Sequence, residues 1–239
     1  MNCCIMNGTD IGGEKMSEKS GFCLISFHRV AFDGEITERL IRSLRFGERE
    51  TDRLLKIKNS RSLALSLSSL LCLQELVSSL ELGDHDLAIL RDANGKPRFE
   101  SLPLHFSISH SNDVCAVALS SHDIGIDLEF IDSSRNTSAI AKRFFSADEC
   151  QSIECARSPV DAFFREWTKK EAIAKLLGEG LVSICANSVK KDENRFFEYE
   201  LELDGNRAAL AVCTIIQSFD TIEIRNPYDK EIKIYEIQN

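Results

Sequence analysis

The chain has 239 residues, of which 43% are hydrophobic and 28% charged, an ordinary composition for a globular protein with one large or two small domains. Its formal net charge of −9 argues against general nucleic-acid binding, because such binding needs a basic surface that neutralises phosphates. An anionic ligand must therefore be held by a local cluster of cations or by a metal ion.

The cysteines and the apolar segments bear on the compartment of the protein. Nine cysteines are present, an odd number, and none forms a CxxC pair, which argues against a structural zinc site. Residues 1–20 contain no apolar stretch typical of a secretory signal, and no later apolar run approaches the length of a bilayer span. The sequence therefore predicts a cytoplasmic protein with reduced cysteines, no membrane association and a disordered leader over residues 1–20.

From residue 21 onward, apolar periodicity indicates an N-terminal half with strands and helices. The predicted elements are a strand over 21–30, helices over 35–44, 48–57 and 60–79, and a turn at 94–97. Three strands separated by polar turns follow, over 105–109, 114–119 and 124–131. The last of these strands already belongs to the next half of the chain.

The C-terminal half continues with helices and then strands. Ser146 and Glu149 have the spacing of a capping box, which predicts the start of a helix. A second helix begins at Ser158-Pro159, where proline suits the first helical position, and runs to about Leu177. Strict apolar–glutamate alternation over 195–203, a turn at Asp204-Gly205 and an apolar run over 208–215 predict a β-hairpin. Strands over 221–225 and 231–237 are expected to complete the sheet.

The order of the elements predicts the fold class. Strand, helices and strands occur twice in succession, which is typical of an α+β fold. We therefore expect two similar α+β halves, residues 21–122 and residues 123–239, that meet near Ser121–Asp123. No sequence repeat accompanies this order, so the duplication rests on the order of the elements alone.

Asp127 and Glu129 lie two residues apart in a predicted strand, so both side chains leave the same face of the sheet. Two carboxylates this close repel each other, and each raises the pKa of the other unless a cation lies between them. A hard divalent ion such as Mg²⁺, which prefers oxygen ligands, would relieve that repulsion. For an isolated Asp-x-Glu, however, a solvated strand edge is the favoured interpretation.

The predicted helix after Ser158 carries a second polar group. Trp167, Glu171 and Lys175 follow one another at four-residue spacing and share one face, with Lys170 beside it. Glu171 is a candidate third metal carboxylate, and the lysines are candidate contacts to phosphate or to an attacking serine. Taken alone, Glu171 with Lys175 is equally a routine helix salt bridge, and Trp167 a routine core residue.

Weaker signals lie upstream of these two segments. His110 stands between Ser109 and Ser111 at the end of a predicted strand, where it can donate to a phosphate or pair with a neighbouring carbonyl. No GxSxG pattern surrounds the serines, so a hydrolase triad has little support. Lys96 lies in the Gly-Lys-Pro turn. Three arginines on neighbouring predicted helices are candidates for a phosphate pocket, although surface arginines are common: Arg49, Arg53 and Arg61.

The combination of motifs resembles the Sfp-type 4′-phosphopantetheinyl transferases. The matching segments, in order, are FSISHS (106–111), IGIDLE (124–129), AKRFFSADE (141–149) and WTKKEAIAKLLGEGL (167–181), preceded by Gly-Lys-Pro. The Gly-Ile-Asp pattern and the Trp-Thr-x-Lys-Glu-Ala-x-x-Lys pattern together are highly specific for that superfamily. The similarity covers residues 94–181 well and is weak on both sides of that range.

The resemblance implies a pseudo-dimer of two α+β halves with coenzyme A (CoA) bound in the cleft between them. It implies Mg²⁺, or Mn²⁺, held by Asp127, Glu129 and Glu171. It further implies contacts to CoA from the following residues: Lys96, Ser109, His110, Lys170, Lys175, Arg61, Arg53 and Arg49. The arginines would bind the 3′-phosphate, although their alignment requires a gap.

The expected reaction is transfer of 4′-phosphopantetheine from CoA to a serine of an apo acyl or peptidyl carrier protein, by a monomeric enzyme. Glu171, Lys175 and Glu149 are the candidate catalytic residues, and Glu149 also has its structural role in the capping box. Two alternatives stay open: a Mg²⁺-dependent phosphohydrolase acting on a nucleotide diphosphate, and a catalytically idle module that binds CoA or a carrier protein.

Overall fold

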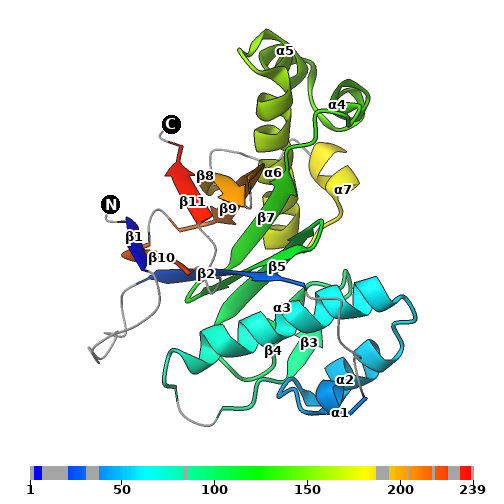
Figure 1. Cartoon of the computed structure of the whole chain (residues 1–239), viewed down its shortest axis with the longest axis vertical. Coiled ribbons are helices and arrows are strands. Elements are labelled where there is room, and N and C mark those ends of the chain that lie inside the picture. Colours follow the sequence, from blue (N-terminus) through cyan, green and yellow to red (C-terminus); the bar gives the residue numbers. More distant parts are fainter. Residues whose placement is uncertain are drawn as a thin grey trace.

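The structure is a computed structural model that describes residues 3–6, 21–30, 38–82, 85–186, 194–203, 205–216, 219–225 and 232–237. It has the predicted α+β fold, with two main sheets and helices beside each of them (Figure 1). No helix in these ranges is long and apolar enough to cross a membrane.

The first sheet has the strand order β1-β10-β2-β6-β5. Its antiparallel part consists of β2 (Phe22–Arg29), β6 (Val114–Ser120) and β5 (His105–Ser111). Helix α3 (Ser60–Ser78) begins at Asn59, whose side chain accepts from the backbone N–H of Ser62, and packs against this sheet. Two shorter helices, α1 (Glu38–Arg42) and α2 (Gly47–Leu55), lie beyond α3 (Figure 1). A small hairpin, β3 (Ile89–Arg91) and β4 (Pro97–Phe99), flanks the predicted turn.

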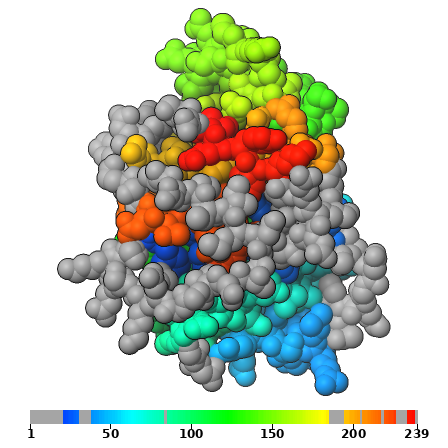
Figure 2. Space-filling model, turned by 60° about the vertical axis from the view of Figure 1, so that its left-hand side comes forward, coloured from blue at the N-terminus to red at the C-terminus, as the bar shows by residue number. Residues whose placement is uncertain are grey.

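The second sheet is antiparallel and has the order β11-β8-β9-β7. Its strands are β7 (Ile124–Phe130), β8 (Arg195–Leu203), β9 (Asn206–Thr214) and β11 (Ile232–Glu236). Helix α6 (Pro159–Leu177) packs against it and ends at Gly178, which has the left-handed conformation. The remaining helices are α4 (Thr137–Phe144), α5 (Ala147–Cys155) and α7 (Leu181–Ala186). Figure 2 shows α5 projecting from the end of the molecule opposite α1 and α2.

One apolar cluster joins the two sheets. Ile25 and Phe27 of β2 are buried together with Ile126 and Leu128 of β7 and Tyr199 of β8. Because neighbouring strand residues point to opposite faces, the burial of Ile126 and Leu128 here sends Asp127 to the face that α6 covers. The alternation predicted for β7 and β8 is therefore confirmed.

Two sequence predictions need correction. Strand β10 (Thr221–Arg225) pairs in parallel with β2 in the first sheet and does not join the second sheet. A segment of the predicted C-terminal half therefore lies in the sheet of the N-terminal half, across the predicted boundary between residues 122 and 123. Strand β1 (Cys3–Met6) pairs with β10, because this short apolar segment meets an unpaired strand edge, so the disordered leader is wrong for these four residues. The β3–β4 hairpin and helices α4 and α7 were not predicted. Residues 7–20, 35–37, Asp204 and Glu231, for which predictions were also made, lie outside the described residues.

Candidate active site

Strand β7 and helix α6 lie unusually close together at Gly125. A Cβ atom at this position would stand 2.0 Å from the carbonyl oxygen of Ala172 and 2.7 Å from the backbone nitrogen of Leu176. Only glycine permits this approach, because any side chain would displace the helix. The glycine of the Gly-Ile-Asp segment thus allows the carboxylates of β7 to meet the polar face of α6.

Asp127 is the most buried carboxylate of the site, with 4% of its surface exposed. Its Oδ1 accepts hydrogen bonds from the Ser109 hydroxyl at 2.8 Å and from Lys175 Nζ at 2.7 Å. Its Oδ2 is buried and has no hydrogen-bond partner among the described residues. Burial raises the pKa of Asp127 above its ordinary value despite the opposing effects of Lys175 and Ser109. One oxygen of this carboxylate is thus paired while the other is left for a further partner.

Glu129 and Glu171 complete the acidic group. Glu129 Oε1 accepts from the indole N–H of Trp167 at 3.2 Å, and Arg135 lies 3.6 Å from its Oε2. Burial, followed by the charge of Asp127, raises the pKa of Glu129. Burial likewise raises the pKa of Glu171, and the charges of Asp127 and Glu129 raise it further. The three carboxyl groups therefore lie close enough to repel one another.

These residues fit a divalent cation chemically. The unpaired Oδ2 of Asp127 and the mutual repulsion of three carboxylates are what a hard cation with oxygen ligands would relieve. The side chains are not preassembled for it, since the described residues contain no group of three or more His, Cys, Asp or Glu side chains in metal-binding geometry. Lys175 instead holds the position of a cation next to Asp127.

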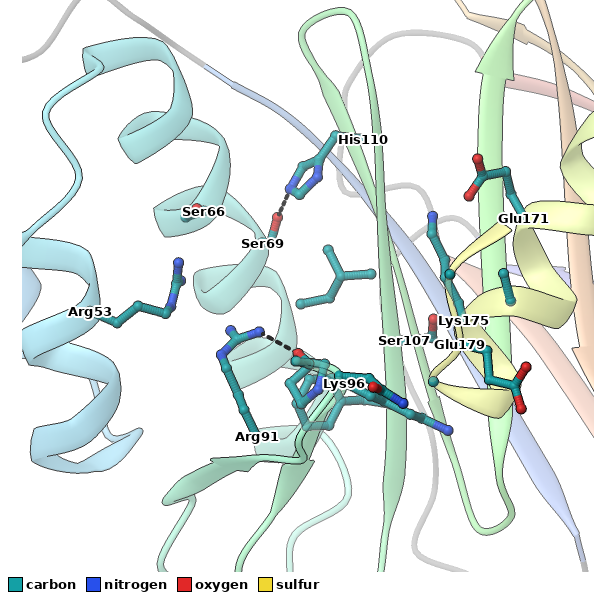
Figure 3. A pocket seen from close by; sticks show the side chains of 18 of the residues that line it. Arg53, Ser66, Ser69, Arg91, Lys96, Ser107, His110, Glu171, Lys175 and Glu179 are labelled. Atoms are coloured by element: carbon teal, nitrogen blue, oxygen red, sulfur yellow. Dashed lines mark hydrogen bonds between the residues drawn. The ribbon is translucent and has the colours of Figure 1, made fainter. Parts of the chain in front are cut away.

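A cavity of about 620 Å³ opens beside the acidic group and reaches across to the first half of the chain. Its lining includes five basic side chains: Arg53, Arg91, Lys96, His110 and Lys175. Figure 3 shows Arg53 and Arg91 facing Glu171 and Lys175 across the cavity, with Lys96 between them. The cavity supplies the local cluster of cations that an acidic chain needs to bind an anion.

Lys96 and His110 reach the cavity but already have partners. Lys96 Nζ donates to the carbonyl of Leu176 at 2.5 Å and lies 3.5 Å from Asp123. Nε2 of His110 lies 2.7 Å from the hydroxyl of Ser69 (Figure 3). Partial burial of the imidazole ring and the charge of Lys175 lower the pKa of His110. The phosphate contacts expected of Lys96 and His110 stay predictions.

The other predicted residues are placed differently. Lys170 is buried against the Phe145 ring, and its Nζ lies 3.0 Å from Glu149, outside the cavity lining. Glu149 also completes the capping box with Ser146, so the predicted structural role is confirmed. Of the three arginines, Arg53 lines the cavity, whereas Arg49 is exposed and Arg61 donates to the carbonyl of Asn112. The CoA contacts proposed for these residues stay predictions.

The comparisons with known proteins point in the same direction as the geometry. Residues 123–221 match the family model of the 4′-phosphopantetheinyl transferase superfamily. The chain is therefore similar to the members of that superfamily over this range. The matched range contains the acidic group on β7 and α6, whereas the arginines and Lys96 on the opposite wall of the cavity lie outside it.

Curated members of the superfamily share about half of the chain. The 4′-phosphopantetheinyl transferase gsp of Aneurinibacillus migulanus is 34% identical over 131 residues, which are 54% of this chain and 54% of that protein. A 4′-phosphopantetheinyl transferase of Bacillus subtilis is 35% identical over 149 residues, 55% of this chain and 65% of that protein. AcpT of Escherichia coli K12 is 36% identical over 131 residues, 53% of this chain and 65% of that protein. The alignments thus span about half to two thirds of these relatives.

Sequence reasoning missed several residues of the cavity. Arg91 donates to buried Glu50 at 3.0 Å, and Arg53 pairs with the same carboxylate at 2.7 Å. Arg91 adjoins the Gly-Lys-Pro turn and donates to the carbonyl of Gly95. No local pattern indicates the pairing of Glu50 with Arg91 or of Ser69 with His110, because the partners lie 41 residues apart in sequence.

Proposed function

We propose that this protein transfers 4′-phosphopantetheine from CoA to a serine of an apo acyl or peptidyl carrier protein. The observation that carries the proposal is the cavity itself, in which basic side chains from both halves face Glu171 and Lys175. CoA has a diphosphate and a 3′-phosphate, which match a site with several separated cations. The names of the similar proteins support the reaction type.

The basic side chains have a binding role in this proposal. Lys175 lies beside the acidic group and is assigned to the diphosphate, whereas Arg53 and Arg91 on the opposite wall are assigned to the 3′-phosphate. Lys96 and His110 contact the phosphates from between these positions. Holding the diphosphate at several points aligns the reacting phosphorus and converts an encounter into an intramolecular reaction.

Glu171 is assigned the role of general base. Its carboxylate lines the cavity, where it can accept a proton from a bound hydroxyl group. It takes the proton of the carrier serine as the serine oxygen bonds to the pantetheine-side phosphorus. The bond from that phosphorus to the bridging oxygen breaks, and 3′,5′-ADP leaves. Asp127, Glu129 and Glu171 would hold Mg²⁺, which when bound supplies neutralisation of the charge on the leaving group.

The carrier is assigned to the side of α4. Lys142 and Arg143 are exposed on this helix, and Arg143 covers the Phe144 ring at 5.1 Å. An acidic carrier would find there a local basic surface on a chain that is acidic overall. The cytoplasmic location and the monomeric state expected from the sequence stay predictions.

The test is to mix the protein with CoA, Mg²⁺ and a panel of apo-carrier proteins and to measure the intact mass of each carrier. We expect at least one carrier to gain one phosphopantetheine and an equal amount of 3′,5′-ADP to appear. Release of 3′,5′-ADP without any carrier would instead indicate the phosphohydrolase. No modification of any carrier, with CoA still bound, would indicate the idle binding module.

A further inference from the structure

The two sheets meet along a row of serines. Strand β5 is the edge of the first sheet, and β7 is the edge of the second. Ser107, Ser109 and Ser111 alternate along β5 and share one face. Their hydroxyl oxygens accept from the backbone N–H groups of Ile126, Leu128 and Phe130 at 3.1, 3.1 and 3.0 Å. These hydroxyls satisfy backbone donors that an edge strand otherwise leaves unpaired.

The three serines differ in what their hydroxyl protons do. Ser109 donates to Oδ1 of Asp127 at 2.8 Å, and Ser111 donates to Oε2 of Glu129 at a longer 3.4 Å. The residue of β7 in the corresponding position for Ser107 is Gly125, which has no side chain to accept a proton. Ser107 and Ser109 therefore make the same bond to the β7 backbone, and Ser109 makes a second one to a carboxylate.

The bond from Ser109 determines which oxygen of Asp127 stays free. A hydroxyl has one proton, and that of Ser109 is used by Asp127. Together with Lys175 it occupies Oδ1, whereas the buried Oδ2 has no partner among the described residues. Ser109 is itself 2% exposed and does not line the cavity, unlike Ser107 and His110.

We infer that Ser109 is a positioning residue for Asp127 and not a contact to CoA. Anchored to β7 through Leu128, its hydroxyl fixes the Asp127 carboxylate so that Oδ2 is presented to a divalent cation. This differs from the CoA contact that the sequence resemblance implied for Ser109. The inference rests on the proposed function, because it concerns the cation that this function uses.

The experiment measures binding of Mn²⁺, as a paramagnetic probe, to the 239-residue protein without CoA and without any carrier. Three variants are compared with the unsubstituted protein: Ser109→Ala, Ser107→Ala and Ser109→Thr. We expect Ser109→Ala to weaken Mn²⁺ binding by about 10- to 100-fold, the usual effect of removing a partner that orients a metal ligand. Ser109→Thr keeps the hydroxyl and should restore most of the affinity.

Ser107→Ala is the matched control, because it loses the same bond to the β7 backbone but no bond to a carboxylate. It should shift the urea midpoint about as much as Ser109→Ala does and leave Mn²⁺ affinity close to that of the unsubstituted protein. Equal loss of Mn²⁺ affinity in both alanine variants would reduce the serine row to a structural role and overturn the inference. So would weaker CoA binding with unchanged Mn²⁺ binding in Ser109→Ala.

The outcome is separable from that of the proposed function. If no carrier is modified but Ser109→Ala selectively weakens Mn²⁺ binding, the transferase proposal is wrong and the positioning role stands. If carriers are modified and the two alanine variants bind Mn²⁺ alike, the transferase proposal stands and the positioning role is wrong. Absence of Mn²⁺ binding in the unsubstituted protein would overturn the positioning role and the metal assignment together.

Discussion

Glu50 and the acidic group of Asp127, Glu129 and Glu171 lie beside the same cavity, and the fold shifts their pKa values in opposite directions. Glu50 is 2% exposed and pairs with Arg53 and Arg91. Burial by itself raises the pKa of Glu50, but hydrogen bonds from the two arginines outweigh it and hold the pKa below its ordinary value. Asp127 is 4% exposed, and its pKa is raised in spite of Lys175.

The difference lies in how many cations face each carboxylate. Glu50 has two arginines to itself, so its charge is balanced within the protein. Asp127, Glu129 and Glu171 lie among one another, with Lys175 bonded to Asp127 and Arg135 3.6 Å from Glu129. A buried charge without compensation costs several kcal/mol, and such cost is usually found where a ligand supplies the missing charge. The comparison thus separates a carboxylate that holds the fold together from carboxylates kept for a ligand.

The largest expected effect is on activity, from Glu171→Gln. This change keeps the size of the side chain and removes a proton acceptor and a metal carboxylate, so the transfer rate should fall by about 10³-fold, equivalent to about 4 kcal/mol. It also removes one of three repelling charges, so the free energy of unfolding without metal should not decrease. Transfer kinetics and urea unfolding measure the two effects.

Glu236→Gln is the control for this prediction, because it removes the charge of an exposed glutamate on β11. It should change neither quantity. A Glu171→Gln protein that transfers at the normal rate would contradict the roles of base and metal ligand. A large loss of stability would show that Glu171, like Glu50, is compensated within the fold.

The next effect is on stability, from Glu50→Gln. Removing this charge leaves Arg53 and Arg91 without their shared partner, and breaking a buried pair costs about 3–5 kcal/mol. Because both arginines are about one third exposed and regain water, we expect a loss of about 2 kcal/mol in the free energy of unfolding. CoA binding should weaken as the arginines lose their positions.

Asp52→Asn, at an exposed position on the same helix, provides the matched control and should cost less than about 0.5 kcal/mol. Equilibrium urea unfolding and calorimetric titration with CoA measure the two effects. If Glu50→Gln is as stable as Asp52→Asn, the two arginines do not depend on Glu50, and the contrast between the two groups of carboxylates fails.

The sequence predicts features that depend on one element, and not those that depend on a partner in a distant segment. Local patterns were reliable: the capping box of Ser146 and Glu149 forms both of its hydrogen bonds, and α6 spans the predicted residues up to Gly178. Strand periodicity paired Asp127 with Glu129 and helix periodicity paired Glu171 with Lys175, and the family resemblance joined the two pairs into one site. Periodicity can be recognised within a single element, and these four residues lie on only two elements, β7 and α6.

What failed depends on contacts between distant segments. The alternation of β10 is equally compatible with either sheet, and its parallel pairing with β2 becomes visible only in three dimensions. Glu50 reads as an ordinary helix glutamate until Arg91 meets it from β3. The pairing of Lys170 with Glu149 of α5 likewise has no signal in the sequence around either residue. In each case the partner determines the role, and no local pattern names the partner.

The smallest effect is on the pH dependence of stability, and it has opposite signs for the two groups. A carboxyl group whose folded pKa is raised binds more protons in the folded state than in the unfolded state, so its contribution to stability is lost as pH rises through the folded pKa. This applies to Asp127, Glu129 and Glu171. The lowered pKa of Glu50 gives a contribution that is present above the unfolded pKa and lost as pH falls through the folded pKa.

The free energy of unfolding is measured for each variant and for the unsubstituted protein without metal, and the variant's value is subtracted from that of the unsubstituted protein. The range of about pH 4 to pH 7 begins near the ordinary glutamate pKa. The stability of the unsubstituted protein relative to Glu171→Gln should fall as pH rises. Mg²⁺ with CoA should reverse this trend, because the ligand supplies the missing positive charge. For Glu50→Gln it should stay constant down to about pH 5 and shrink only below that. Parallel curves for the two variants would mean that the acidic group is balanced within the protein, and that no cation is needed to complete it.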